Sequence, residues 1–241
     1  MEGFTLAHLK TKITAEDYHP AGRLVSLLCA SGDYYSLISA ALTLGRKAAS
    51  YGETVLMLDC CGGKMMQRAG LVYNKTLKDV VLHDAPLSDA LYVTSNEHFT
   101  ATAIGDLSLE DSLGSLAALS LSYDWVIVIP EEGCTPAHMQ LASAADISLL
   151  GYGTQKDNFM RAFWMIDAVR RRMPKFDPLV LSTGPKVDAV ETALMLADTV
   201  RDHLGAPPPY AGHVKDVNIE GRLITQMREQ MARKNVAQLV N

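Results

Sequence analysis

The residues with the most obvious chemical potential lie between Arg23 and Ser39. Leu24 to Leu28 is an apolar run of strand length, Ala30 to Gly32 is a turn of small residues, and Leu37 to Ser50 has helical spacing of apolar side chains. A strand, a tight turn and a helix in this order can present backbone N–H groups of the helix N-terminus to a phosphate. This stretch is therefore the first candidate for a phosphate-binding loop.

The pattern G-x-x-x-x-G-K-[ST] fits this stretch only at its ends. Gly32 and Ser39 match the first and last positions, but Leu37 replaces the second glycine and Ile38 replaces the lysine. That lysine normally reaches the β- and γ-phosphates, and Asp33 adds a negative charge nearby. The sequence thus predicts a degenerate nucleotide site; the alternative is a turn that never bound phosphate.

Asp59 is a second candidate, because it follows the apolar strand pattern of Thr54 to Leu58. A carboxylate at the carboxyl end of a strand can hold a magnesium-bound water, and the alternative is an aspartate that caps the following turn. Cys134 and His138 share a helix face, but a metal pair needs further ligands that the sequence does not supply. We therefore predict no metal site.

Composition limits the class of protein. The chain has 241 residues, of which 48% are hydrophobic and 20% charged, and its net charge of −5 argues against general nucleic-acid binding. The four cysteines form no CxxC pair, which favours reduced thiols. No apolar run has the length of a membrane-spanning helix, and the first residues lack a signal-peptide pattern, so we expect a cytoplasmic protein.

Strand and helix patterns alternate along the chain, which predicts an α/β fold with a mostly parallel central sheet and helices on both faces. The expected domains are an N-terminal extension (1–22), one α/β domain (23–217) and a C-terminal amphipathic helix (218–241). After the first strand and helix, the expected strands are 54–58, 99–103, 125–129, 147–150, 179–181 and 210–214. The expected helices are 76–82, 86–91, 107–120, 136–144, 155–172 and 187–204.

Six segments, in order, resemble the MinD/ParA family of deviant P-loop ATPases, over about residues 22–216. They are the turn at Cys29–Gly32, TVLMLDCCGG (54–63), KTLKDVVLHDAPLSDAL (75–91), YDWVIVIPEEG (123–133) and the pair AADISLLGYG (144–153) and HLGAPPPYAGHVKD (203–216). By this resemblance Asp33 occupies the position of the signature lysine, Ile38 that of the loop lysine and Ser39 that of the magnesium-binding hydroxyl. Asp59 matches the first aspartate after the second strand, and Ile129 stands where the Walker B aspartate belongs.

The resemblance implies a P-loop NTPase-like fold without the family's catalytic groups. We expect no catalytic residue, no cofactor and no ATP hydrolysis, and a scaffold or regulator instead. The implied process is cell division, or the positioning and assembly of a flagellum, a pilus or a polysaccharide-secretion apparatus. The alternatives are an unorthodox ATP-dependent switch that takes a lysine from Lys64 or from a partner, and a small-molecule enzyme that reuses the crevice.

The tail from Asn218 to Asn241 predicts an amphipathic helix. Its apolar residues include Leu223, Ile224, Met227 and Met231, which we expect to contact a protein partner or the inner membrane. The alternative is a helix packed back on the sheet. The expected partners are proteins of a larger assembly, with an ATP-independent homodimer and peripheral membrane contact as open alternatives and nucleic acid disfavoured.

Overall fold

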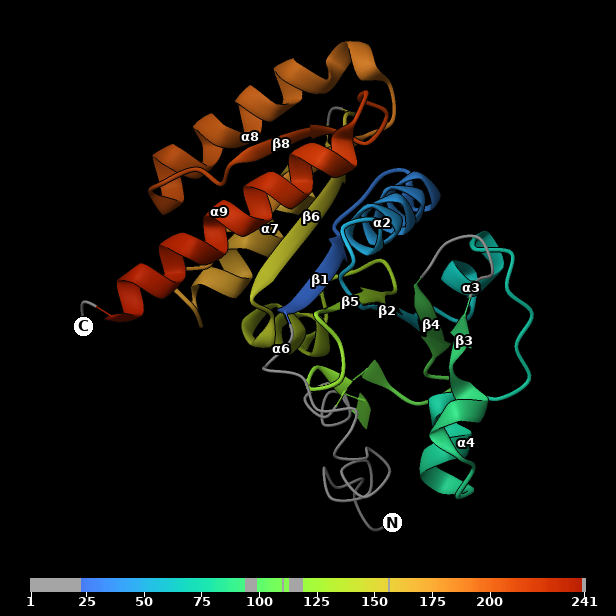
Figure 1. The fold of residues 1–241 in the computed structure, drawn as a ribbon. Coiled ribbons are helices and arrows are strands. Elements are labelled where there is room, and N and C mark those ends of the chain that lie inside the picture. Colours follow the sequence, from blue (N-terminus) through green and yellow to red (C-terminus); the bar gives the residue numbers. More distant parts are fainter. Residues whose placement is uncertain (1–22, 94–98, 110, 113–118, 156, 240–241) are drawn as a thin grey trace. The chain divides into compact units, whose positions relative to one another are not determined.

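The computed structural model describes residues 23–239 apart from 94–98, 110, 113–118 and 156, with backbone alone at 234–239 (Figure 1). Its contacts divide the chain into two compact units. Among the described residues, the first unit combines 23–25 with 45–131, and the second combines 26–44 with 132–239. Each unit contains part of the predicted domain of residues 23–217. The predicted extension of residues 1–22 lies outside the described residues.

Eight strands and nine helical segments have defined bounds in the described residues. The strands are β1 (Arg23–Cys29), β2 (Val55–Cys60), β3 (Tyr92–Val93), β4 (Thr100–Ala103), β5 (Trp125–Pro130), β6 (Ile147–Gly153), β7 (Leu179–Thr183) and β8 (Tyr210–His213). The helices are α2 (Tyr34–Ala49), α3 (Lys64–Arg68), α4 (Leu77–Leu82), α6 (Pro136–Ala144), α7 (Asn158–Arg170), α8 (Ala189–Leu204) and α9 (Ile219–Leu239), with 3₁₀ turns η2 (Leu87–Ala90) and η3 (Lys186–Asp188).

The strand order is β3-β4-β2-β5-β1-β6-β7-β8. The pairs β2–β4, β2–β5, β6–β7 and β7–β8 are parallel, and only β3–β4 among the described pairs is antiparallel. The prediction of a mostly parallel sheet with β1, β2 and β5 as interior strands is therefore confirmed. Continuous apolar runs can occupy such positions because both faces of the strand are covered.

In the first unit, β2 and β5 form the centre of the core. All six residues of each strand are buried, and the register pairs Val55 with Trp125 through to Cys60 with Pro130. Thr54 and Asp124 join the strand starts, because the Asp124 carboxylate accepts hydrogen bonds from the Thr54 N–H and hydroxyl. The apolar strands thus carry polar anchors only at their ends.

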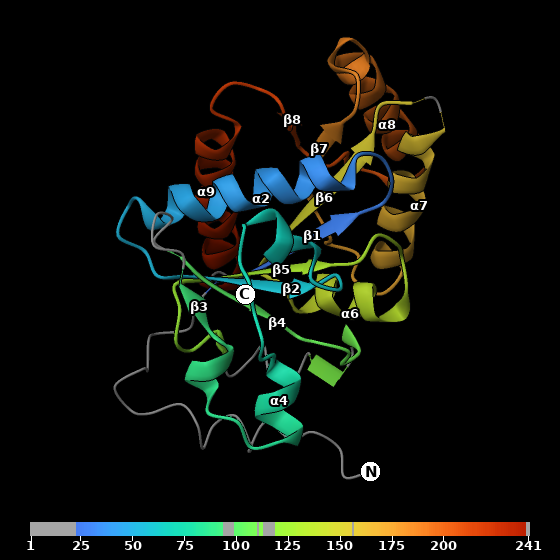
Figure 2. The same ribbon diagram turned by 90° about the vertical axis from the view of Figure 1, so that its right-hand side faces the viewer.

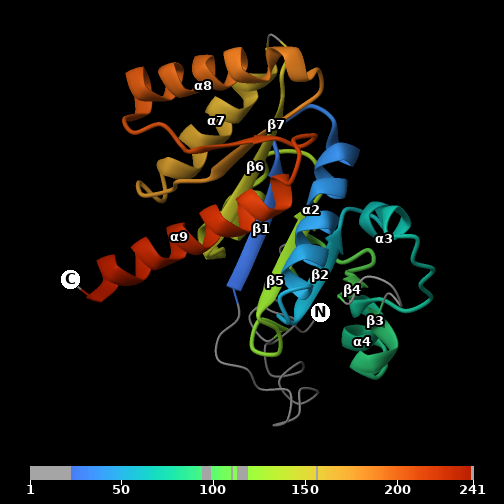
Figure 3. The same ribbon diagram turned by 45° about the horizontal axis from the view of Figure 1, so that its top comes forward.

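In the second unit, helices cover both faces of β6. Figures 2 and 3 show α7 and α8 stacked on one face and α9 lying on the other. Strand alternation explains the division, since Leu150 and Tyr152 point into the cluster that holds Ala162, Ile166 and other side chains of α7. This cluster also includes Leu196 and Val200 of α8, so the second unit has a core of its own.

Several bounds differ from the predicted ones. Helix α2 begins at Tyr34, one turn before the predicted start at Leu37, and α3 and β3 were not predicted. The first helical turn of α2 carries no apolar periodicity, and α3 and β3 are too short to show any. Half of the predicted helix at 107–120 lies outside the described residues.

Helix α9 packs on β8 and β6, as the alternative for the tail expected. Leu223, Ile224 and Met227 are buried and Met231 is half-buried, so the predicted interaction residues lie in the core of the second unit. The helix in the tail was predicted correctly. In the structure these side chains face the sheet, and not a partner or a membrane as expected. Such contact would require α9 to leave the sheet, and it stays a prediction.

The burial of Met227 gives a direct test of this packing. Replacing Met227 with alanine should lower the free energy of unfolding by about 2–5 kcal/mol, because the cavity left in the core cannot collapse fully. Urea unfolding measures this change, and Thr225→Ala on the exposed side of the same helix should stay within about 0.5 kcal/mol of the wild type. Equal stability of Met227→Ala and wild type would show that α9 is not docked in solution.

Candidate functional site

The candidate site is the edge of the second unit where four parallel strands end. The segments after β1, β6, β7 and β8 begin at Ala30, Thr154, Gly184 and Val214. Open α/β sheets bind ligands at this carboxyl edge, because loops and helix N-termini gather there. The first of these four segments is the loop for which the sequence predicts a degenerate nucleotide site.

Gly32 fixes the position of that loop. Its φ is +101°, a conformation that suits glycine, and a Cβ there would lie 2.6 Å from both Cα and N of Gly153 and would collide with Thr183 Oγ1. Ser31 adds two bonds, since its Oγ donates to the Asn158 carbonyl and accepts from the Gly153 N–H. The turn is thereby held tightly against the ends of β6 and β7.

Asp33 caps the N-terminus of α2 with its own carboxylate. The Ser36 N–H donates to Asp33 Oδ1 at 3.0 Å, and the Ser36 hydroxyl donates to Oδ2. A helix N-terminus attracts negative charge and offers unpaired N–H groups, which is how phosphate loops bind their ligand. Here an internal anion takes that place.

The backbone donors of the loop are also engaged within the chain. The Asp33 N–H donates to Thr183 Oγ1 at 3.0 Å, the Tyr34 N–H to the Gly32 carbonyl and the Leu37 N–H to the Asp33 carbonyl. Together with the Ser36 N–H, these are the groups that would have to turn toward a phosphate. Binding phosphate here would therefore require existing hydrogen bonds to break.

Leu37 and Ile38 belong to the core instead of the loop surface. Both side chains are fully buried, and Leu37 fills the space beside Gly151, where a Cβ would lie 2.5 Å from Leu37 Cδ2. Ser39 donates its hydroxyl to the Tyr35 carbonyl at 2.8 Å, a bond within the helix. Packed side chains thus occupy the positions of the second glycine and the lysine, and the hydroxyl of the pattern is present but bonded within the helix.

The other three segments are tied to one another as well. Thr154 Oγ1 donates to the Pro185 carbonyl, and Lys186 forms an ion pair with Asp216, with Nζ and Oδ1 2.7 Å apart. His213 Nδ1 accepts the Lys215 N–H at 3.0 Å, so Nε2 carries the proton and lies 3.1 Å from the Gly184 carbonyl. We call this set of bonds, from Asp33–Thr183 to Lys186–Asp216, the edge network.

Asp59, in the first unit, is buried and caps the following turn. Its Oδ1 accepts the N–H groups of Cys61 at 2.8 Å and Gly63 at 3.1 Å, and its Oδ2 accepts the Met66 N–H at 2.9 Å. Both carboxylate oxygens are therefore engaged by the backbone around α3. This is the capping alternative that the sequence left open.

Ile129 lies beside Asp59 in the register of β5 and β2 and is fully buried. The position where the resemblance expects the Walker B aspartate thus belongs to the apolar core of the first unit. A carboxylate at this position would be buried, and burying an unpaired charge is costly.

The remaining polar candidates have structural roles. His138 Nδ1 lies 2.7 Å from Thr135 Oγ1 in the cap of α6, and no cluster of His, Cys, Asp or Glu among the described residues could hold a metal ion. Burial raises the pKa of the Cys29 thiol to about 12, with the charge of Glu132 adding to the effect, and burial also raises that of Cys60. These thiols stay protonated and are poor nucleophiles.

Two further observations limit the options. A cavity beside Tyr152 and Tyr210 has a volume of about 20 Å³, which suits a single water and not a substrate. Within the part of the chain that the structure describes, no helix combines the length and apolar character needed to cross a membrane.

Neither a triphosphate nor its magnesium fits the residues present. The loop has the Asp33 anion where a cation is needed, the N–H groups of Asp33, Ser36 and Leu37 are engaged, and the lysine position is buried and apolar. Ser39 and Asp59, which could have approached a magnesium ion, direct their oxygens to backbone groups.

Comparison of sequences finds no match to this chain among family models or curated proteins. Comparison of structures finds a chain of the MinC:MinD cell division protein complex of Aquifex aeolicus, with a TM-score of 0.64 and 18% identity over 90% of this chain and 96% of that chain. The structure of MinD cell division protein of Aquifex aeolicus is also similar, with a TM-score of 0.62 and 19% identity over 87% of both chains. The chain has the MinD/ParA fold.

A ParA family ATPase from Chlorobium tepidum TLS has the same fold, with a TM-score of 0.61 and 14% identity over 88% of this chain and 90% of that chain. The fold expected from the order of motifs is therefore confirmed. Because the identities are below 20%, the likeness concerns the MinD/ParA fold and does not transfer an activity.

Of the edge network, sequence reasoning identified only Asp33 as a candidate site residue. Thr183 and His213 were not singled out, although each ends an apolar strand pattern, which was the available signal. Their partners are 150 residues away in the case of Asp33 and Thr183, and 29 residues away for Gly184 and His213. Separations of this kind leave no local pattern in the sequence.

The cap on α2 predicts a graded response to substitution. Asp33→Ala should lower the free energy of unfolding by about 0.5–2 kcal/mol, whereas Asp33→Asn should be nearly neutral because asparagine also accepts the Ser36 N–H. Urea unfolding of the three proteins tests this expectation. If Asp33→Ala were as stable as wild type, the carboxylate would not be capping the helix.

His213 predicts a pH dependence of stability. Burial lowers the pKa of His213 in the folded protein, whereas the unfolded side chain titrates near about 6.5. The unfolded state thus binds the proton more readily, so this contribution to the free energy of unfolding is present above about pH 6.5 and falls as the pH decreases below it. We expect a larger decrease between pH 7.5 and 5.5 in wild type than in His213→Gln.

Asp216 lies against His213 but acts in a different pH range. Burial opposes ionisation of Asp216, but hydrogen bonds from Lys186 and the His213 N–H outweigh it and lower its pKa. Its contribution is lost only as the pH falls below about 3.9, the ordinary value for an aspartate. The decrease between pH 7.5 and 5.5 is therefore assigned to His213. Identical pH profiles of wild type and His213→Gln over this range would contradict that assignment.

Proposed function

We propose that this chain is a nucleotide-independent protein of the MinD/ParA fold that acts as a scaffold or regulator in the cytoplasm. The observation that supports this most directly is the Asp33 carboxylate at the N-terminus of α2, where it bonds Ser36. In a phosphate loop the same N-terminus is offered to the ligand. A protein with this arrangement keeps one loop conformation with or without ATP.

The loss of binding follows from magnitudes. Each charge-assisted hydrogen bond that is missing weakens binding by about 1.5–3 kcal/mol, which corresponds to about ten- to a hundredfold in affinity. The loop lacks its lysine, carries the Asp33 anion and has engaged donors at Asp33, Ser36 and Leu37. Several such losses together bring the affinity for Mg-ATP below cellular relevance.

The process we propose is cell division, or the positioning and assembly of a flagellum, a pilus or a polysaccharide-secretion apparatus. The support for it is the fold shared with the Aquifex aeolicus cell division protein MinD and with a ParA family ATPase. Such a scaffold acts through the proteins it holds, so its partners should be retained in the absence of nucleotide.

Calorimetric titration with Mg-ATP and a phosphate-release assay test the proposal. We expect no binding at micromolar concentrations and no turnover by wild type. The double variant Asp33→Lys/Ile38→Lys restores both cations of the pattern and serves as the comparison for Mg-ATP binding. Because Ile38 is buried, the fold of this variant must first be checked by circular dichroism.

The same preparation also tests the scaffold role. Proteins that copurify with the native chain should be the same after ATP is removed with apyrase as in its presence. Micromolar binding of Mg-ATP by wild type, or turnover that disappears in Ser39→Ala, would overturn the proposal and favour the ATP-dependent switch.

A further inference from the structure

Helix α8 presents an apolar row on its outer face. Val187, just before the helix, is 87% exposed, Val190 is 66% exposed and Leu194 is 60% exposed. Their spacing of three and four residues places them on one side of the helix, opposite the buried residues Leu196 and Val200. Single exposed apolar residues are common on protein surfaces, but an aligned row of them marks an interaction surface.

A further exposed apolar residue, Val217, is linked to the start of this row through an ion pair. Val217, which is 90% exposed, follows Asp216 directly, and Asp216 is paired with Lys186, the residue before Val187. This ion pair joins the loop after β8 to the segment just before α8, and Val217 and Val187 each follow one member of the pair. Both members of the pair belong to the edge network.

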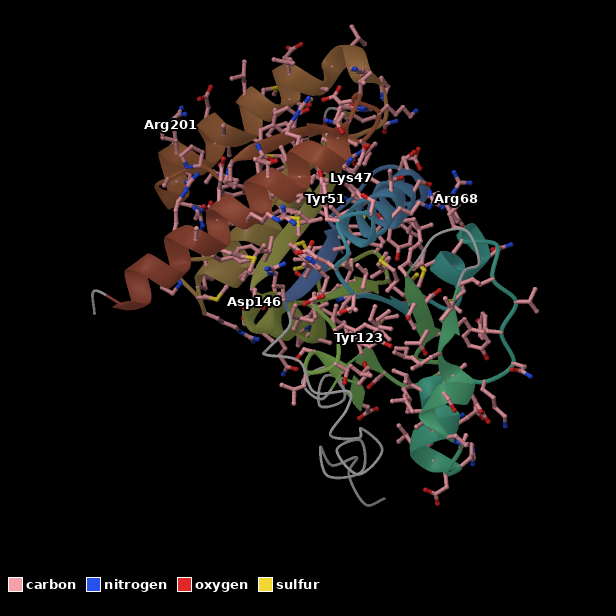
Figure 4. The ribbon with its side chains drawn as sticks, in the orientation of Figure 1. Lys47, Tyr51, Arg68, Tyr123, Asp146 and Arg201 are labelled. Carbon is pink, nitrogen blue, oxygen red and sulfur yellow. The ribbon has the colours of Figure 1, made fainter. Side chains whose placement is uncertain are left out.

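An acidic row lies alongside the apolar one. Glu191, Asp198 and Asp202 are exposed at spacings of seven and four residues, with Met195 between the first two. The two cations of this segment are already matched by carboxylates, Arg201 by Asp198 and Lys186 by Asp216. Figure 4 shows that Arg201 points away from its unit, so this face of α8 is directed outward.

We propose that this face of α8 is a docking surface for a basic amphipathic helix of a protein partner. The apolar side of such a helix would pack on Val187, Val190 and Leu194, and its lysines or arginines would face Glu191 and Asp202. The apolar row from Val187 to Leu194 extends over about 10 Å, or two helical turns, at 1.5 Å per residue. This surface is separate from the degenerate loop, so the inference does not depend on the lack of nucleotide binding.

Charge disfavours the other occupants of this face. A second copy of α8 packed on the first would place acidic rows near each other, which is unfavourable. Anionic lipid headgroups and nucleic acid would be repelled by the same carboxylates. Complementarity of charge thus selects a cationic partner, and the apolar row selects an amphipathic one.

The test uses three fluorescently labelled 14-residue peptides as probes. The first is an amphipathic leucine–lysine helix, the second has glutamate at every lysine position, and the third is a scrambled leucine–lysine sequence. We expect the full chain to bind the first peptide at least tenfold more tightly than the second or the third, as measured by fluorescence anisotropy at 150 mM salt.

Two sets of substitutions separate the apolar and acidic contributions. Val190→Ser/Leu194→Ser should weaken binding of the leucine–lysine peptide at least tenfold, and so should Glu191→Lys/Asp202→Lys. Val72→Ser is the matched control, because Val72 is 92% exposed but lies in the first unit. Circular dichroism and thermal unfolding confirm that each variant is folded, which these exposed positions should permit.

Several results would overturn the proposal. Equal binding of all three peptides, or an affinity that neither pair of substitutions changes, would show that α8 is not the docking surface. Dimerisation in analytical ultracentrifugation that Val190→Ser/Leu194→Ser abolishes would assign the face to a second copy. Binding to vesicles of anionic or neutral lipid that the same pair abolishes would assign it to a membrane.

Discussion

The bond between the Asp33 carboxylate and the first turn of α2 sets the state of the candidate site. A helix N-terminus has N–H groups without partners in the helix and a partial positive charge, so it needs either a ligand or a cap. In this chain the cap is internal and one residue before the helix. The turn, the packing of Gly32 and the bond from the Asp33 N–H to Thr183 all depend on the loop staying in this conformation.

Hydrogen bonds within the chain also engage the polar groups along the carboxyl edge of the second unit. Thr183 accepts the Asp33 N–H and donates to the Tyr152 carbonyl, so one hydroxyl links the loop to two strands. The Gly184 carbonyl accepts a hydrogen bond from His213 Nε2, and Lys186 forms an ion pair with Asp216. Buried polar groups are costly without partners, and the bonds of the edge network therefore stabilise this edge without a ligand. In the first unit Asp59 follows the same principle, since both its oxygens serve the turn at α3.

Much of the fold could be predicted because its strands are apolar for their whole length. β2 and β5 were placed to within a residue or two by composition alone, and α6 was placed correctly, helped by Pro136 at its start. Short elements such as α3 could not be predicted, because five residues show no periodicity. The apolar spacing of Leu223, Ile224 and Met227 predicted the helix but not what covers it, since an amphipathic face is the same before and after packing.

The candidate site was predicted in part and for a definable reason. The residues of the loop pattern were identified, because their types and order are local properties of the sequence. The role of Asp33 was predicted only as repulsion of phosphate, whereas the structure shows it as the cap of α2. That role, like those of Thr183 and His213, depends on contacts that only the fold creates.

Amide hydrogen exchange of the loop, with and without Mg-ATP, tests the central claim most directly. If the chain's own bonds close the site, the N–H groups of Asp33, Ser36 and Leu37 should exchange slowly in the protein alone, and millimolar Mg-ATP should leave their rates unchanged. Rapid exchange in the protein alone, followed by strong protection of these amides when Mg-ATP is added, would contradict the account.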